Sequence, residues 1–157
     1  MAEPERRWMR VEVSFRIFGE DLDPNAVTEV LGMTPDSAIK RGEEHDLKAG
    51  SKVIHSRPAR QGGWIIKSKL PPDVHVEEHL RVMLALLEPK AAAIQDLRGA
   101  GNSADFFCGL FLQDYNDGVE LPPEMLADIA ALGATLGLDI YDASHPQESG
   151  EDPAGTG

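Results

Sequence analysis

The stretch that decides the fold is Val11-Glu12-Val13-Ser14-Phe15-Arg16-Ile17, in which an apolar residue occupies every second position. Successive side chains of a β-strand point to opposite faces of a sheet, so this alternation predicts a strand with one buried and one solvated face. A turn at 19–23 follows, and apolar residues at helical spacing from Pro24 predict a short helix with Gly32 as its C-terminal cap. The chain therefore begins with a strand followed by a helix.

An apolar stretch runs into Leu-x-Pro three times, at residues 22–24, 70–72 and 121–123. Because proline fixes φ near the helical value and has no N–H to donate, each of these sites is predicted to be a strand-to-helix junction. The pattern predicts helices from Asp73, kinked or split at Pro89, and from Pro123. Strands are expected at 52–56 paired with 64–70, at 104–112, at 119–121 after a tight turn at 116–118, and at 138–141. Residues 33–50 are interpreted as a polar connection.

These elements predict an α+β domain with an antiparallel or mixed sheet of about five to six strands and three main helices. One form that such a domain takes is a ferredoxin-like arrangement with an added αβ unit. The expected boundaries are a polar N-terminal arm at 1–10, a single domain at 11–143, and a disordered acidic tail at 144–157. No apolar run has the ~20 residues needed to span a bilayer, so no membrane association is expected. The polar start of the chain and its single cysteine, Cys108, favour a cytoplasmic location.

Charge is segregated along the sequence. Residues 40–69 hold eight of the fifteen Lys and Arg residues against three acids, no Lys or Arg follows Arg98, and the net charge is −12. The overall negative charge opposes binding to nucleic acid, because phosphates would repel the protein. The basic segment can attract an anionic ligand or partner, or it can neutralise the acidic half of the same chain.

The candidate ligand-binding residues are Arg41, Arg57, Arg60 and Trp64, together with Lys40. Arginine side chains can bind carboxylate or phosphate through paired hydrogen bonds, and an indole ring can stack on a ring or a cation. In this hypothesis the predicted pair of strands forms a basic hairpin that carries the site. The alternative is that Trp64 fills the core beside Ile66, while the basic side chains pair with acidic neighbours.

A second candidate is the pair His75 and His79, whose spacing of four residues can place two imidazoles on one helical face for zinc. The residue after His75 is Val76, whereas the metalloprotease pattern requires a general-base glutamate there, and no third ligand is evident. A solvated helix face is therefore the favoured interpretation, and no metal or cofactor is expected. Cys108 lies among apolar residues, which favours a core position over a nucleophile, because burial raises the pKa of a thiol.

Two further segments fail as binding motifs. Residues 114–118 resemble the start of a calcium loop, but such a loop needs glycine at its sixth position and glutamate at its twelfth, where Met125 stands here. Residues 99–103 follow a helix instead of leading from a strand into one, so they are interpreted as a helix end and not as a phosphate cradle.

Several segments together resemble the bacterial domain-of-unknown-function family 4279, over about residues 11–142. The segments that carry the resemblance are Phe15–Glu20 with Leu22-Asp23-Pro24, Thr34-Pro35, Arg41-Gly42, Gly62-Gly63-Trp64, Glu78-His79-Leu80, Leu86–Lys90, Ala104–Gly109, Leu121–Glu124 and Leu138–Tyr141. The resemblance implies the architecture and supplies no catalytic residue.

The expected function is a non-enzymatic binding or interaction module of immunity type, whose acidic second half complements a basic protein partner. The alternative is a domain that binds an anionic small molecule, or an enzyme that acts on one, through the basic hairpin. The sequence does not indicate an oligomeric state.

Overall fold

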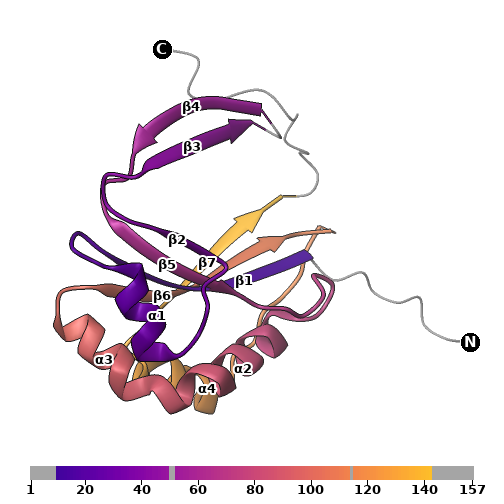
Figure 1. Ribbon diagram of the computed structural model, residues 1–157. Helices are drawn as coiled ribbons and strands as arrows, with labels where there is room; N and C mark the ends of the chain where they lie inside the picture. The colour runs from indigo at the N-terminus through magenta and orange to yellow at the C-terminus, as the bar shows by residue number, and fades with distance from the viewer. Residues whose placement is uncertain (1–9, 50–51, 114, 143–157) are drawn as a thin grey trace, which may run out of the picture.

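A five-stranded mixed sheet forms the centre of the molecule in the computed structural model, which describes residues 10–49, 52–113 and 115–142 (Figure 1). The central strand β1 (Arg10–Gly19) lies between β5 (Gly62–Lys67) and β6 (Ser103–Phe111), and pairs antiparallel with both. Strand β2 (Ser37–Ile39) pairs antiparallel with β5, and β7 (Thr135–Tyr141) pairs parallel with β6 at the other edge. The predicted tail and residues 1–9 of the predicted arm lie outside the described residues.

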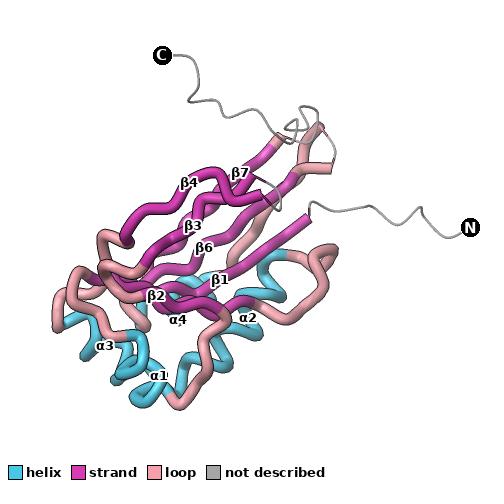
Figure 2. Tube along the Cα trace, turned by 45° about the horizontal axis from the view of Figure 1, so that its top comes forward, coloured by secondary structure: helices cyan, strands magenta, loops and turns pink. Residues whose placement is uncertain are grey.

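The described residues form four α-helices, which cover one face of this sheet and confirm the α+β class (Figures 1 and 2). They are α1 (Pro24–Leu31), α2 (Val76–Leu87), α3 (Ala91–Gly99) and α4 (Pro123–Ala131). The alternation in β1 buries Val11, Val13, Phe15 and Ile17 against them. The rings of Phe15 and Phe106 lie 5.2 Å apart beneath the sheet, and removal of this apolar surface from water is the main driving force for the fold.

The helix boundaries follow from local chemistry. Asp23 caps α1 by accepting a hydrogen bond from the backbone N–H of Asn25, and Gly32 ends the helix with φ at 64°, a conformation that favours glycine. Proline at 89 separates α2 from α3 through a short 3₁₀ turn at Glu88–Lys90, as expected. The predicted cap Asp73 is wrong, because α2 begins three residues later, after His75.

The segment predicted as a polar connection contains β2 and also β3 (Glu44–Ala49), which pairs with β4 (Lys52–Pro58). The predicted pairing of 52–56 with 64–70 is therefore wrong, because β5 pairs with β1 and β2 instead. Strand β5 is apolar and lies between β1 and β2 in the sheet, whereas the polar β3 pairs with β4. The β3–β4 hairpin lies on the side of the sheet opposite the helices (Figures 1 and 2).

The predicted turn at 116–118 and strand at 119–121 are also wrong. Residues 116–122 are irregular, and Gly118 is not among the glycines with positive φ. The reason is topological, because β1 and β7 occupy the two edges of β6 and leave no edge on which 119–121 could pair after a tight turn. This segment instead carries the chain from the end of β6 across to α4.

The face of the sheet away from the helices carries an ion pair between aromatic rings. Arg16 donates two hydrogen bonds to Asp105, at 2.9 and 2.7 Å, and its guanidinium lies 5.2 Å from the ring centroid of Phe18 and 4.3 Å from that of Phe107. These neighbours leave both charged side chains only about a quarter exposed. Among the described helices, none is long and apolar enough to cross a membrane.

Candidate functional site

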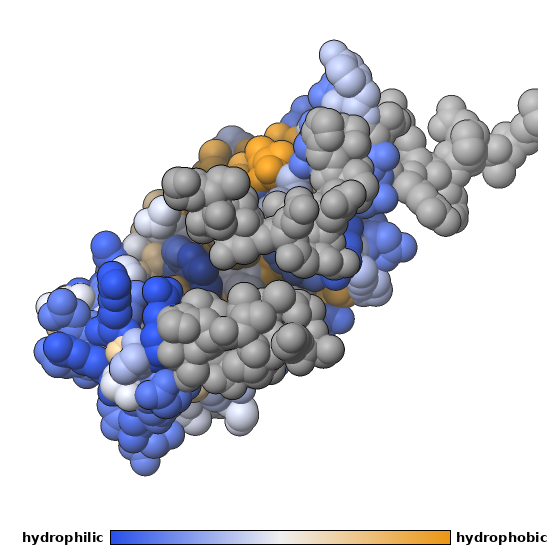
Figure 3. Space-filling view, turned by 90° about the horizontal axis from the view of Figure 1, so that it is seen from above, coloured by the Kyte–Doolittle hydropathy of each residue, from blue (hydrophilic) through white to orange (hydrophobic). Residues whose placement is uncertain are grey.

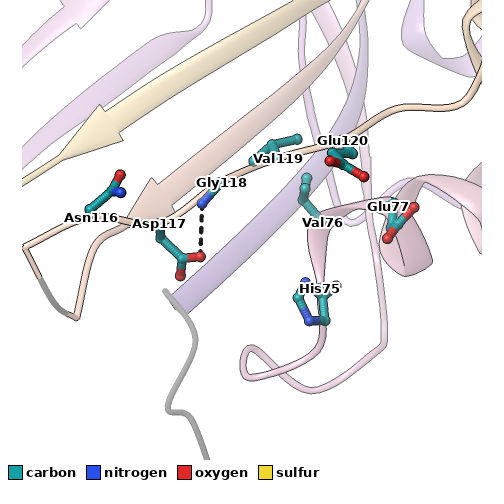
Figure 4. A pocket seen from close by; sticks show the side chains of 8 residues that line it. All are labelled: His75, Val76, Glu77, Asn116, Asp117, Gly118, Val119 and Glu120. Carbon is teal, nitrogen blue, oxygen red and sulfur yellow. Dashed lines mark hydrogen bonds between the residues drawn. The ribbon is translucent and has the colours of Figure 1, made fainter.

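A cleft of about 390 Å³ opens between the start of α2 and the irregular segment that leads to α4 (Figure 4). One wall is formed by His75, Val76 and Glu77, and the other by residues 116–120. In Figure 4 the carboxylates of Glu77 and Glu120 approach each other from opposite walls, and Asp117 lies further along the same hollow. The cleft therefore brings three carboxylates from two separate parts of the chain into one place.

The local structure of each wall follows from its sequence. Glu77 and Glu78 occupy the first turn of α2, where the positive end of the helix dipole stabilises a carboxylate. On the opposite wall, the side chain of Asp117 accepts a hydrogen bond of 2.8 Å from the backbone N–H of Gly118. The backbone N–H of Val11 donates to the carbonyl of Pro72, which ties the loop before α2 to the beginning of β1. The cleft is thus held at the end of the sheet where β1 starts.

The cleft has strong negative character. Its described lining contains no lysine or arginine, and neither Glu77 nor Glu120 forms an ion pair with any described residue. Both glutamates also line an adjoining hollow of about 450 Å³ with Leu121 and Pro122. Arg10, at the same end of β1, is paired with Glu12 at 2.7 Å. Among the described residues, no cation therefore neutralises the charge of Glu77 and Glu120.

An apolar hollow of about 310 Å³ continues the cleft toward β7. It shares Asn116, Asp117 and Val119 with the acidic part. The remaining lining residues are Leu110, Leu112, Tyr115, Leu138 and Ile140. Carboxylates beside apolar surface suit a long cationic side chain, whose hydrocarbon stem and charged head need these two environments. Among the described residues, no group of three or more His, Cys, Asp or Glu side chains could hold a metal ion.

The predicted basic residues lie at the other end of β1. Backbone hydrogen bonds from Gly42 to Ala59 and from Ala59 to Glu43 bring Arg41 into the same region as Arg57 and Arg60, and all three arginines are exposed. Hydrophilic side chains dominate the left end of Figure 3, where the connections from β2 to β3 and from β4 to β5 lie. Lys40 and Arg41 lie 3.9 Å from Asp23 and Asp21, respectively, so the chain pairs these cations with its own acids.

Trp64 does not join those arginines. Its side chain is completely buried, and its indole N–H donates a hydrogen bond of 3.1 Å to the hydroxyl of Thr28 on α1. An indole in this position fills the core beside Ile66 and cannot stack on a ligand. The core alternative for Trp64 is therefore confirmed, and its assignment as a ligand-stacking residue is wrong.

The two predicted histidines are separated by the fold. His75 precedes α2 and lines the acidic cleft, whereas His79 is 1% exposed and its Nδ1 lies 2.7 Å from the hydroxyl of Ser68. The prediction of a solvated helix face is wrong for His79, because that face of α2 packs against the sheet. Burial lowers the pKa of His79, and the carbonyls of Pro71 and Val74 partly offset this effect. Its Nε2 has no hydrogen-bond partner among the described residues.

Cys108 is completely buried in β6, as expected for a core residue. Burial, with a smaller contribution from the negative charge of Asp105, raises the pKa of the thiol to about 12. The thiolate is the reactive form of cysteine, so this environment suppresses nucleophilic chemistry at neutral pH.

The acidic cleft was not predicted from the sequence. Its two walls are about 40 residues apart along the chain, and only the packing of α2 beside the crossover segment brings them together. The signal that was available is the absence of lysine and arginine after Arg98, which makes the second wall acidic wherever it lies.

These observations define an α+β domain with a mixed sheet, one face covered by helices, and an acidic cleft at one end. A family model described as "Domain of unknown function (DUF4279)" matches residues 9–143, so the chain belongs to this family. Neither the search of curated proteins nor the search of solved structures gave a match.

Proposed function

We propose that the protein is a non-enzymatic binding module of immunity type, which uses the acidic cleft to bind a basic segment of a protein partner. The observation that carries this proposal is the placement of Glu77 and Glu120 on opposite walls of one hollow, without an ion-pair partner among the described residues. A lysine or arginine side chain of a partner can enter between them and form charge-assisted hydrogen bonds with both.

The surroundings of the glutamates support this choice of partner. The adjoining apolar hollow can receive the hydrocarbon part of the bound side chain or an apolar neighbour in the partner sequence. The acidic surface also accelerates the approach of a basic partner, because complementary charge steers diffusional encounter. A protein partner is therefore favoured over a free metal ion or an anionic metabolite at this site.

The test uses a fluorescent oligoarginine peptide as the probe and measures its anisotropy as protein is added. We expect saturable binding that weakens with added salt, because exposed charge attraction is screened. The double variant Glu77→Gln/Glu120→Gln should weaken peptide binding by about tenfold or more. A tenfold change corresponds to the loss of about 1.4 kcal/mol of binding free energy. An oligoglutamate peptide of the same length should not bind.

The matched control is Glu20→Gln with Glu29→Gln, which removes the same charge from exposed positions outside the cleft. This variant should change the affinity by less than about threefold, since only long-range attraction is altered. Equal weakening by the two double variants would show that net charge alone attracts the peptide. That result, or no binding of the peptide, would overturn the proposal.

A second candidate function is the binding of an anionic small molecule by Arg41, Arg57 and Arg60, or an enzymatic reaction on such a molecule. The observation in its favour is the pair of hydrogen bonds that joins residues 42–43 to Ala59 and gathers these arginines. A thermal-shift screen with phosphorylated and carboxylated metabolites tests it. Stabilisation that Arg60→Ala abolishes would support this function, and the absence of any stabilising compound would contradict it.

A further inference from the structure

The outer edge of β7 is a strand edge without a described partner. Strand β7 pairs with β6 on one side, and no described strand pairs with its other side. Three of its residues are unusually exposed for apolar and aromatic side chains, with Leu138 at 44%, Ile140 at 60% and Tyr141 at 37%. Strand edges on soluble proteins usually carry lysine, proline or a bulge that prevents pairing, and the sequence Thr-Leu-Gly-Leu-Asp-Ile-Tyr has no lysine or proline.

The backbone direction of β7 shows which groups face outward. The carbonyl of Tyr141 accepts a hydrogen bond of 2.9 Å from the N–H of Leu112, so Tyr141 directs its backbone groups toward β6. These directions alternate along a strand, so Asp139 and Gly137 also face β6. Leu136, Leu138 and Ile140 therefore present their N–H and C=O groups to the open edge.

From this pattern we propose that two copies of the chain pair antiparallel through β7, around a two-fold axis at Leu138. In this register Leu138 lies opposite Leu138 of the second copy, and Leu136 lies opposite Ile140. These are the outward-facing residues, so each pair can exchange two backbone hydrogen bonds. The two five-stranded sheets then join into one continuous sheet.

The side chains are compatible with this register. All three apolar residues of the strand lie on one face, so the pairing places Leu136, Leu138 and Ile140 of one copy beside the same residues of the other. The only charged residue of β7, Asp139, falls opposite Gly137, and the pairing therefore sets no like charges directly opposite each other. Leu138 and Ile140 also line the apolar hollow at this edge, which a second copy would help to cover.

The first experiment is sedimentation velocity of the full chain over a range of protein concentrations. We expect a monomer–dimer equilibrium that added salt does not weaken, because apolar contacts and backbone hydrogen bonds hold the interface. Leu138→Lys places two ammonium groups at the axis and should raise the dissociation constant by at least about tenfold. The matched control is Val82→Lys on α2, where the replaced side chain is similarly exposed, at 47%, and the dissociation constant should not change.

The second experiment tests the register without weakening the interface. Leu138→Cys puts two thiols across the axis at a Cα separation of about 5.5 Å, within the range for a disulfide, so mild oxidation should give a covalent dimer. Ile140→Cys should not, because its two copies would lie about 14 Å apart. Both cysteine variants are made with Cys108→Ala, because Leu138 lies directly opposite Cys108 in the pairing of β6 with β7 and the two thiols of one copy could otherwise join each other.

Three results would overturn the proposal: a monomer at every concentration, a dimer that Leu138→Lys leaves intact, or equal cross-linking of the two cysteine variants. The dimer and the proposed function both use the apolar hollow that Leu138 and Ile140 line, but their failures are distinguishable. Binding of the oligoarginine peptide weakens with salt and on loss of Glu77 and Glu120, whereas the dimer is insensitive to both.

Discussion

The two ends of β1 differ in whether their charged side chains have ion-pair partners among the described residues. At the end where β1 finishes, Lys40 and Arg41 lie beside Asp23 and Asp21 on exposed turns. At the end where β1 starts, about 30 Å away for a strand of this length, Glu77 and Glu120 face a cleft and have no ion-pair partner among the described residues. The charge segregation along the sequence thus becomes a separation in space.

At the basic end, acidic side chains of the same chain neutralise Lys40 and Arg41. At the acidic end, the negative charge remains available to a partner. An exposed ion pair at 3.9 Å adds little stability, but it reduces the local field that a ligand would experience. Two carboxylates on opposite walls of a hollow repel each other and favour a cation between them. The acidic end is therefore the stronger candidate for a binding site, although the basic end contains the more conspicuous residues in the sequence.

The largest predicted effect concerns the residue that the sequence placed at the basic end as a ligand contact. Trp64→Ala should lower the free energy of unfolding by about 3–5 kcal/mol, because it empties a buried position and removes the hydrogen bond to Thr28. Trp64→Phe should lose less, since it keeps a ring in the core. Denaturant unfolding followed by circular dichroism measures both variants.

The matched comparison is Glu77→Gln with Glu120→Gln at the acidic end, which should leave the unfolding midpoint nearly unchanged while it weakens peptide binding. A stable Trp64→Ala variant would contradict the structural role given to the basic end. A strongly destabilised glutamine variant would show that the acidic cleft is part of the framework of the fold.

The second effect concerns the ion pair of Arg16 and Asp105, which lies between the two ends on the face away from the helices. Their hydrogen bonds raise the pKa of Arg16, and the rings of Phe18 and Phe107 shield the pair from water. Asp105→Ala should cost about 1–2 kcal/mol of stability, because a half-buried guanidinium loses its carboxylate.

A double-mutant cycle with Arg16→Ala isolates the interaction energy of this pair. The same cycle on Arg41 and Asp21 serves as the reference, and the coupling should be clearly larger for Arg16 and Asp105. Equal coupling energies would mean that burial between the rings does not strengthen the pair.

The sequence predicted those parts of the fold that depend on local pattern. Each of these patterns determines the structure of only a few neighbouring residues, and the corresponding elements are present. The patterns are the alternation in β1, the apolar run in β6 and the prolines at 24, 89 and 123. Predictions of pairing were less successful. The partner of 52–58 is the polar segment 44–49, whose side chains give no apolar alternation, and the strand expected at 119–121 does not form.

The candidate site was harder to predict, because exposure depends on contacts between distant segments. The surroundings of Trp64 and His79 are set by distant segments, since one contacts α1 and the other lies beside Ser68. The acidic cleft needs both α2 and the crossover segment, and no local motif marks it. Residue type alone therefore favoured the arginines, while the fold places the unneutralised charge elsewhere.

The third prediction concerns His79, one turn into α2 from the acidic cleft. Its pKa is lowered in the folded state, so the unfolded state, with an ordinary histidine pKa of about 6.5, binds the proton more strongly. The contribution of neutral His79 to the free energy of unfolding is complete above this pKa of about 6.5. It is lost as the pH falls below that pKa. Thermal unfolding at pH 7 and pH 5 should show a smaller decrease for His79→Asn, which does not titrate, than for the unmodified protein.

The same substitution at His75, on the wall of the cleft, provides the control. His75→Asn should keep the pH dependence of the unmodified protein, because this side chain lies on the wall of the cleft and not between α2 and the sheet. If His79→Asn loses as much stability between the two pH values as the unmodified protein does, the acid sensitivity arises from other groups.

The smallest effect is expected at the basic end. Arg41→Ala removes an exposed partner of Asp21, and such pairs contribute little because water and salt screen them, so the melting temperature should change by no more than about 1–2 °C. The variant should also increase the affinity for the oligoarginine peptide slightly, since it makes the protein more negative without altering the cleft. Weaker peptide binding after this substitution would mean that the two ends are coupled, and the acidic cleft could then not be treated as an independent site.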